Sequence, residues 1–340
     1  MNLLLKVKTY EEYEDSTKYG ELFYVSLVND FREQLPPAMR KYRFSDQHPS
    51  LKQAQIIVFG DSHFDHSRSV SLPERLARQT GKNVYYHRIN KPFWGNALAF
   101  LETNGVQPQQ KRLFVYGTTE RYIPERFMVP YHPQVIDSKV KPHRYLLDQV
   151  LFPENAEFLY ATVMKRSYLT HNLYTHLSTL RFRLFKYINS FTPVYHIDPQ
   201  NGSWLFTSET VNHFHHQYTD EQIDVFATNI SHLANMIKQK YNMDFLFLPV
   251  PERYSIYYDL TGEEEYHHFL TRLYIKLDKY NVAYIPLYDD YKNSDVLLYH
   301  KTDTHWNTHG VHIALEKTLE AINGRYFSNN IQLSGESENE

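Results

Sequence analysis

The sequence predicts an α/β fold built on a mainly parallel sheet, and three observations support this prediction. Short apolar runs bounded by turn-forming residues have the character of buried strands. Segments with helical periodicity and capping residues lie between several of these runs. Strands that alternate with helices pair in parallel, because each helix carries the chain back across the sheet. The predicted strands are residues 55–60, 83–89, 111–117, 243–250 and 281–288.

Two predicted helices follow the first two strands. Segment 71–81 has Pro73 near its start and Gly81 at its end, and segment 95–105 ends at Gly105. Proline fits the first turn of a helix and glycine fits the residue after its last turn. Together with the later strands, these helices predict a three-layer sandwich with a five-stranded sheet of flavodoxin-like order.

The predicted domain organisation follows from one long connection. Residues 118–242 separate the third and fourth predicted strands, which is far more than a crossover needs. We therefore expect a helical insertion, a cap or subdomain, at about 124–241 within an α/β domain of residues 51–330. Residues 1–50 are expected to form an N-terminal extension, and the polar residues 331–340 a flexible tail.

Composition limits the classes of partner. The net charge of -3 gives no overall attraction for polyanions, so we expect no nucleic-acid partner. The absence of cysteine excludes disulfides and thiol catalysis. Aromatic residues make up 16% of the chain, which fits flat surfaces that pack on sugars and equally fits a large aromatic core. No apolar run approaches the ~20 residues of a transmembrane helix, so any export signal or anchor is expected to be absent from this chain.

The predicted helix within 163–191 has two interpretations. Its basic residues alternate with aromatic ones and are Lys165, Arg166, Arg181, Arg183 and Lys186. The helix is either amphipathic with a solvated basic face, or it forms a wall against an acidic polymer or a membrane-proximal partner. The spacing leaves both interpretations open.

The turn after the first predicted strand carries a candidate nucleophile. Gly60-Asp61-Ser62 ends that strand, and a serine hydroxyl needs a base to accept its proton. His305 follows the last predicted strand, and Asp303 has a spacing suited to holding its imidazole. Reactive groups of open parallel sheets gather beyond the carboxyl ends of the strands. We therefore expect Ser62, Asp303 and His305 to meet there as a catalytic triad.

Further residues are candidates for supporting roles. The backbone N–H groups of Ser62 and Gly95 and the side chain of Asn96 are candidate oxyanion donors, although Gly95 fits equally well as a plain helix-start glycine. Aromatic candidates for contact with a saccharide are Trp94, Tyr116 and Trp306, each of which is otherwise a core residue. Polar candidates that orient substrate are Arg88, Glu120 and Arg121, and the last two alternatively pair with each other.

These motifs resemble a known superfamily. The "GDS" turn, with an Asp and a His before a C-terminal helix, looks like the SGNH (GDSL-like) hydrolases. More narrowly, "YHKTDTHWNTHG" (299–310) resembles the Asp-Thr-His-Trp box of the alginate O-acetyltransferase-like branch, and "NGSWLF" (201–206) and "LPVPERYSIY" (248–257) are similar to two other segments of that branch. Two features differ: here the serine precedes the box, and "VYGTTERYI" (115–123) replaces the usual Gly-x-Asn-Asp block.

The resemblance implies a function. It implies a serine esterase or O-acetyltransferase without a cofactor, which acts on acylated, in the first instance acetylated, polysaccharide or glycan through an acyl-Ser62 intermediate. It also implies an extracytoplasmic location, in the periplasm or at the cell surface, and a membrane-bound acyl-donor protein as a partner. One alternative is a non-catalytic saccharide-binding or assembly protein that keeps the SGNH frame.

A metal enzyme is the other alternative. Asp61-x-His63 resembles the opening of the calcineurin-like metallophosphoesterases, and His-rich clusters occur at 213–216 and 305–312. Two metals need ligands from several strand ends, and the segments after the second and third predicted strands lack the expected Asp, Asn and His blocks. We therefore favour the serine interpretation and expect no metal site.

Overall fold

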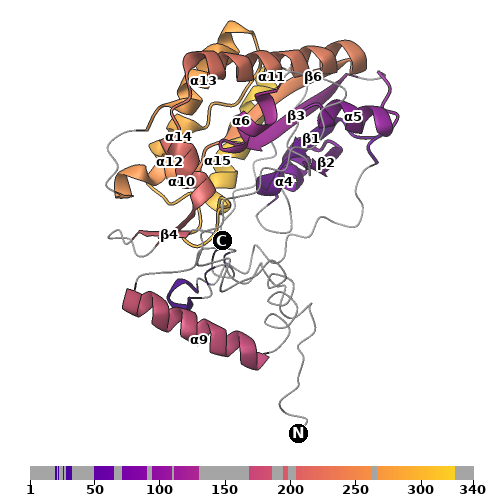
Figure 1. The fold of residues 1–340 in the computed structure, drawn as a ribbon. Coiled ribbons are helices and arrows are strands. Elements are labelled where there is room, and N and C mark those ends of the chain that lie inside the picture. The colour runs from indigo at the N-terminus through magenta and orange to yellow at the C-terminus, as the bar shows by residue number, and fades with distance from the viewer. Residues whose placement is uncertain are drawn as a thin grey trace.

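The structure is a computed structural model, shown in Figure 1. The residues that it describes are 20, 22, 26, 28–32, 50–64, 71–89, 94–108, 111–129, 168–185, 194–197, 204–261 and 266–325. The expected tail at 331–340 lies outside them, as do the flanks of the predicted helix at 163–167 and 186–191.

A parallel sheet forms the centre of the molecule. Its strands are β1 (Ile56–Gly60), β2 (Val84–Arg88), β3 (Arg112–Thr119) and β6 (Met243–Val250), in the order β2-β1-β3-β6 with every pair parallel (Figure 1). Every residue of β1 and β3 is buried, as expected for strands covered on both faces. The predicted α/β class and parallel sheet are confirmed.

The predicted count of five strands is wrong for the described sheet. Segment 281–288 lies beside β6 but forms only one parallel bridge, between Phe247 and Tyr284. Phe247 donates to the Ala283 carbonyl, and Ile285 donates back to Phe247. Pro286 has no N–H and cannot extend this ladder, and helix α14 (Tyr288–Lys292) begins directly afterwards. The segment occupies the place of a fifth strand without continuing as one.

Helices cover the sheet and give the molecule three layers. Helices α4 (Leu72–Thr80) and α15 (Thr308–Arg325) pack together, whereas α11 (Asp220–Tyr241) packs on β6 and α13 (Phe269–Lys279). Figure 1 shows α11 and α13 above the sheet and α4 below it. The Tyr241 hydroxyl donates to Leu98 of α5 (Asn96–Thr103), which places α5 beside α11. No helix within the described residues combines the length and apolarity that crossing a bilayer needs.

Local capping explains why these helices begin and end where they do. The Ser71 side chain accepts from Glu74 N at the start of α4, and Gly81 ends the helix with φ 62°, a conformation that suits glycine. Thr219 and Gln222 form a capping box at the start of α11. The predicted bounds of α4 are confirmed to within a residue.

The interval 124–241 contains elements of two kinds. Its described elements outside the sandwich layers include α9 (Tyr168–Phe185) and the antiparallel pair β4 (Val194–Ile197) and β5 (Trp204–Thr207), followed by α10 (Ser208–His215). Helix α11 lies in the same interval but forms part of the layer over the sheet. The bounds of the insertion and of the domains stay a prediction.

A second, smaller core joins segments distant in sequence. It consists of Leu22, Val28, Phe31, Phe182 and Leu205. Leu22 N donates to Thr302 O at 3.0 Å, and Leu205 N donates to Lys301 O at 3.1 Å. The described part of the predicted N-terminal extension therefore packs against the loop that carries the Asp-Thr-His-Trp sequence.

A close contact fixes the turn after β1. Gly60 and Gly117 are partners in the β1–β3 register, and the Phe64 ring lies over both. An ideal Cβ on Gly117 would lie 2.3 Å from Phe64 Cζ, and one on Gly60 would lie 2.7 Å from the same ring. The ring also meets Trp306 edge-on at 5.5 Å. Two glycines are therefore needed for the turn to fold back onto the sheet.

Replacing Gly117 with alanine tests this contact. We expect Gly117→Ala to lower the free energy of unfolding by about 1–3 kcal/mol, because the buried Phe64 ring must shift. Urea denaturation measures the change. Gly324→Ala is the matched control: nothing lies within 4 Å of a Cβ there, so this helical position should become more stable, by up to about 1 kcal/mol. A Gly117→Ala variant as stable as the wild type would contradict the packing.

Candidate active site

Asp303 and His305 form a buried, hydrogen-bonded couple. His305 Nδ1 lies 2.6 Å from Asp303 Oδ1, and the same oxygen accepts the His305 backbone N–H at 2.9 Å. Because a carboxylate only accepts, Nδ1 carries the proton and Nε2, which is also buried, is the basic nitrogen. The two side chains that sequence analysis predicted as base and orienting acid are therefore hydrogen-bonded to each other.

Arg253 holds the loop that carries this couple. Its Nη1 donates to the carbonyl oxygens of His300 at 2.5 Å, Lys301 at 3.0 Å and Asp303 at 2.7 Å. The buried guanidinium lies 4.4 Å from the centre of the Phe206 ring and 5.6 Å from that of Trp204. The segments 201–206, 248–257 and 299–310 thus meet around one arginine.

The turn that carries Ser62 packs against the same loop. Ser62 begins a 3-10 helix (Ser62–Phe64) and is partly exposed. His63 Nε2 lies 3.2 Å from Thr304 O, Trp306 Nε1 donates to His63 O at 2.9 Å, and the rings of His63 and His305 are 4.8 Å apart. Residues separated by 241 positions in the chain are therefore neighbours at the end of β1.

Among the described residues, no hydrogen bond joins Ser62 Oγ to His305 Nε2. Catalytic hydrogen bonds are often long without substrate and tighten when it binds. The turn of Ser62 and the loop of His305 are thus linked through His63, which contacts Thr304 and the His305 ring.

Asp61 anchors the Ser62 turn. Its carboxylate accepts from Thr119 N at 2.7 Å, Thr119 Oγ1 at 3.0 Å, His63 N at 3.1 Å and Arg126 Nη1 at 3.3 Å. Burial alone would raise the pKa of Asp61, but hydrogen bonding to His63 and the charge of Arg126 hold it well below its usual value. Asp61 is therefore ionised and bonds through both of its oxygens.

The geometry does not favour a metal at Asp61 and His63. His63 Nε2 faces a carbonyl oxygen, which only accepts, so this nitrogen carries a proton and cannot ligate. His63 Nδ1 lies 2.8 Å from Thr119 Oγ1. Among the described residues, no three or more His, Asp or Glu side chains gather in a way that could hold a metal ion.

The candidate oxyanion donors lie at two strand ends. Gly95 is the N-cap of α5 and Asn96 its first residue, after β2, whereas Ser62 follows β1. Asn96 Nδ2 is buried and has no hydrogen-bond partner among the described residues. An unused buried amide is costly unless a ligand pairs with it, so Asn96 stays a candidate side-chain donor.

All three aromatic residues predicted to contact a saccharide need correction. Tyr116 and Trp306 are fully buried: Tyr116 packs on Phe59 and Phe127, and Trp306 packs on His63 and Phe64. Neither ring has a face open to a sugar. Trp94 is buried as well and donates to Val129 O at 3.0 Å. Arg88 is exposed at the end of β2.

Glu120 is the centre of a buried network that sequence analysis missed. It is fully buried and does not pair with Arg121. Its carboxylate accepts from His213 Nε2 at 3.2 Å, Ser255 Oγ at 3.1 Å, Tyr266 OH at 2.5 Å and Glu252 N at 2.8 Å. Burial and the Glu120 charge keep the pKa of Tyr266 well above its usual value, so this hydroxyl remains a donor.

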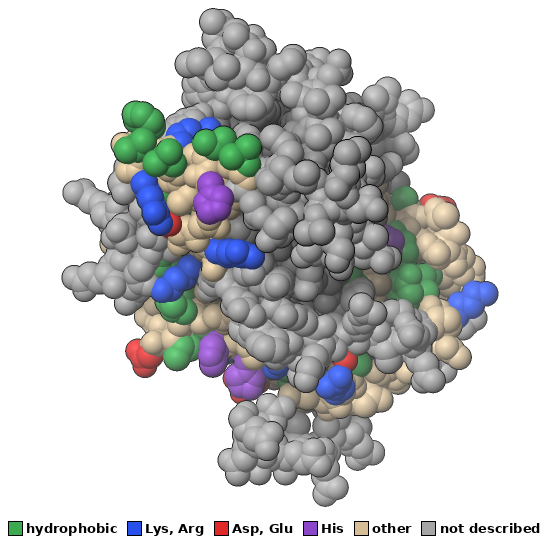
Figure 2. All heavy atoms as spheres, turned by 90° about the horizontal axis from the view of Figure 1, so that it is seen from below, with side chains coloured by type: hydrophobic (Ala, Val, Ile, Leu, Met, Phe, Trp, Pro, Cys, Tyr) green, Lys and Arg blue, Asp and Glu red, His purple; other side chains and the backbone are tan. Residues whose placement is uncertain are grey.

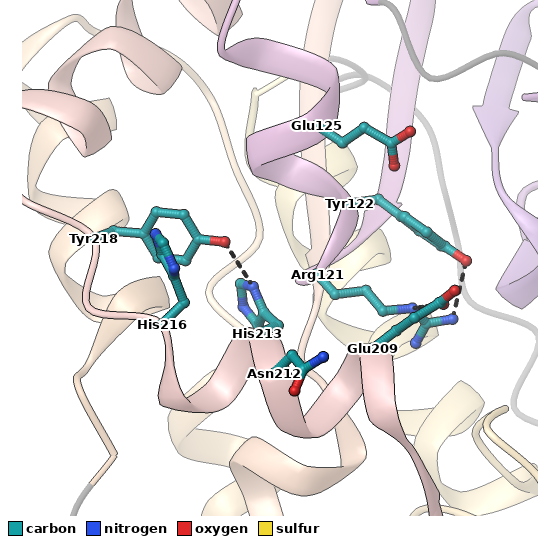
Figure 3. A pocket seen from close by; sticks show the side chains of 8 residues that line it. All are labelled: Arg121, Tyr122, Glu125, Glu209, Asn212, His213, His216 and Tyr218. Atoms are coloured by element: carbon teal, nitrogen blue, oxygen red, sulfur yellow. Dashed lines mark hydrogen bonds and ion pairs between the residues drawn. The ribbon is translucent and has the colours of Figure 1, made fainter. Parts of the chain in front are cut away.

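A pocket of ≈ 410 Å³ lies beside this network (Figure 3). Its lining is polar and comprises Arg121, Tyr122, Glu125, Glu209, Asn212, His213, His216 and Tyr218. Figure 3 shows Tyr122 and Glu125 on α6 (Tyr122–Phe127) facing Glu209, Asn212 and His213 on α10. Arg121 pairs with the buried Glu252 at the pocket wall. Ser62 is not part of the lining, but the pocket begins directly beyond β3, the strand next to β1.

Scans against protein-family models, curated proteins and solved structures gave no match. The identification of the candidate site therefore depends on its geometry and on the sequence motifs. The residues that sequence analysis missed, His213, Glu252 and Arg253, are buried polar groups whose partners lie far away in the chain. The three histidines of "HFHH" (213–216) were the one local signal for His213.

Asp61→Asn tests the anchor of the turn. The folded-state pKa of Asp61 is lowered, so its stabilising contribution is complete above the unfolded pKa of about 3.9 and is lost as the pH falls below that value. At pH 7 we expect the variant to lose about 3 kcal/mol of unfolding free energy, because Arg126 stays buried without its partner. Urea denaturation measures the free energy of unfolding of both proteins. The difference in this free energy between wild type and variant should be constant between about pH 7 and 5 and should become smaller below about pH 4.

Asp295→Asn provides the control, since Asp295 is exposed and should not affect unfolding at either pH. A difference between wild type and Asp61→Asn that stays the same down to pH 3 would show that Asp61 does not anchor the turn as a carboxylate.

Proposed function

We propose that this protein is a serine-dependent acyl esterase or O-acetyltransferase that acts on an acylated, in the first instance acetylated, polysaccharide or glycan. The observation that carries the proposal is the Asp303–His305 couple, 2.6 Å between its atoms, packed through His63 against the turn of Ser62. The meeting of three segments around Arg253 adds support, because all three contribute to the resemblance to the O-acetyltransferase-like branch.

The proposed reaction has two steps. Ser62 Oγ attacks the carbonyl carbon of the acyl ester while His305 Nε2 takes its proton, and Asp303 stabilises the imidazolium. The same nitrogen returns the proton to the departing sugar oxygen, and the acyl group remains on Ser62. Water or a second sugar hydroxyl then attacks the acyl-serine, again with His305 as the base, and Ser62 regains its proton.

The oxyanion of each step needs hydrogen-bond donors. We assign this role to the Ser62 backbone N–H and to Asn96, whose buried Nδ2 has no partner among the described residues. The extracytoplasmic location and the membrane-bound acyl-donor partner are further parts of the proposal, and they come from the resemblance alone.

Hydrolysis of p-nitrophenyl acetate tests the nucleophile. We expect Ser62→Ala and His305→Asn each to lower kcat/KM at least about 100-fold, because each removes a group that acts in the transition state. Ser294→Ala, in a surface loop, is the control and should retain activity. Activity unchanged in Ser62→Ala would remove the mechanism. Activity lost to a chelator and restored by Mn²⁺ or Zn²⁺ would favour the metallophosphoesterase-like alternative.

The polar pocket provides a candidate site for the glycan. Its volume of ≈ 410 Å³ lies within the range of small-molecule sites, and its carboxylate, amide and imidazole groups suit hydroxyl-rich ligands. His213 is oriented there from both sides, by Glu120 at Nε2 and by the Tyr218 hydroxyl at Nδ1. We therefore place the acceptor or donor sugar in this pocket, one strand away from Ser62.

Substitutions in the pocket separate binding from chemistry. Glu209→Gln and Asn212→Ala should each raise KM for an acetylated oligosaccharide by about 3- to 30-fold. Each substitution removes one hydrogen bond to the sugar, which contributes about 0.5–1.5 kcal/mol when both partners are neutral and somewhat more when one is charged. Neither should alter kcat/KM for p-nitrophenyl acetate, which is too small to need the pocket. An equal loss with both substrates would show that the pocket supports the fold and does not bind the glycan.

If the chain is instead a saccharide-binding protein without catalysis, oligosaccharide binding by calorimetry will be present and weakened by the pocket variants. The p-nitrophenyl acetate activity will then be absent in the wild type.

A further inference from the structure

Helix α9 presents its apolar side chains outward. Leu173, Leu177, Leu180 and Leu184 are 54–65% exposed, whereas the polar Thr175, Ser178 and Thr179 are buried. The leucines are spaced by four, three and four residues, which places them in one stripe along the helix. Thr179 faces the interior, where its hydroxyl accepts from Asn29 N at 2.9 Å. We call these four leucines the leucine stripe.

The orientation of α9 is fixed from its inner side. Phe182 packs edge-on against Phe31 at 5.0 Å in the small core, and Arg183 pairs with Asp30 at 2.7 Å. The helix thus cannot turn its leucines inward without breaking these contacts. A continuous exposed apolar stripe on a folded protein marks a contact surface.

The sequence segment that contains the stripe is rich in basic residues. Between Glu157 and Asp198 the sequence has no Asp or Glu, but it has five basic residues, Lys165, Arg166, Arg181, Arg183 and Lys186. This contrasts with the net charge of -3 of the whole chain. At about 100° per residue, Arg181 and Arg183 lie on opposite sides of the leucine stripe. Arg183 remains 65% exposed despite its pairing with Asp30.

Figure 2 shows the molecule from below, the side on which α9 lies in Figure 1. Hydrophobic side chains there adjoin Lys, Arg and His side chains on the same face. This combination of an apolar stripe and basic flanks is typical of helices that lie in the interface of an anionic membrane.

A second copy of the chain is a less suitable binding partner for the leucine stripe than a membrane surface. From Leu173 to Leu184 the stripe covers fewer than two heptads, whereas a stable coiled coil needs three or four. In a symmetric pair the flanking arginines would also face each other as like charges. We therefore propose that α9 binds the surface of an anionic lipid bilayer through the leucine stripe, with the basic flanks at the lipid headgroups.

Co-sedimentation of the full chain with vesicles tests the proposal. We expect binding to phosphatidylglycerol vesicles that weakens with salt, and little binding to phosphatidylcholine vesicles. The double variant Leu177→Ser/Leu180→Ser should bind phosphatidylglycerol about tenfold or more weakly, because two apolar side chains no longer enter the bilayer. Ile275→Ser is the matched control, since Ile275 is also an exposed apolar residue, at 67%, on α13. This variant should bind like the wild type.

Three results would overturn the proposal. They are failure of the wild type to bind phosphatidylglycerol, equal binding by the double variant, and a dimer in light scattering that the same two substitutions dissociate. The last result would assign the leucine stripe to a second copy of the chain. Circular dichroism of the double variant should match the wild type, because both leucines are at the surface.

Discussion

The buried carboxylate of Asp61 is the interaction on which the candidate site depends. A charge removed from water must be compensated by partners of good geometry, and Asp61 finds them on three elements: Thr119 at the end of β3, Arg126 on α6 and His63 in its own turn. His63 then contacts Thr304 and Trp306 at the far end of the chain. The need to compensate one carboxylate therefore fixes where the Ser62 turn lies relative to the Asp303–His305 couple.

The same constraint recurs along the sheet edge. Three adjacent strands, β1, β3 and β6, are each followed by a buried acid, namely Asp61, Glu120 and Glu252. Each acid is paired with groups from the connecting loops, and Glu252 N donates to Glu120, which links two of them. These three buried acids and their partners form a polar network along this edge of the sheet. Such a network can hold catalytic groups in place, which matters because small displacements of a nucleophile or a donor slow a reaction by large factors. The network also connects the proposed acyl-transfer site with the polar pocket beyond β3.

Sequence patterns predicted the parts of this arrangement that depend on local physics. Apolar runs identified β1, β2, β3 and β6, Pro73 and Gly81 indicated the ends of α4, and the two-residue spacing of Asp303 and His305 predicted their hydrogen bond. Pro286 prevents segment 281–288 from continuing as a fifth strand. This proline is visible in the sequence, but the prediction gave more weight to the apolar run around it. Tyr116 and Trp306 could not be placed from the sequence, because an aromatic residue has the same sequence signature in a core and at a rim. The Glu120–His213 contact joins residues 93 positions apart, so only the tertiary structure reveals it.

Covalent labelling tests most directly whether Ser62 is a nucleophile that His305 activates. The full chain would be treated with a fluorophosphonate, digested and mapped by mass spectrometry, with His305→Asn treated in parallel. We expect one phosphonyl adduct, on Ser62, and its formation should be lost or strongly slowed in His305→Asn because the hydroxyl no longer has its base. An unlabelled Ser62 in the folded wild type, or labelling that proceeds equally fast without His305, would contradict this mechanism.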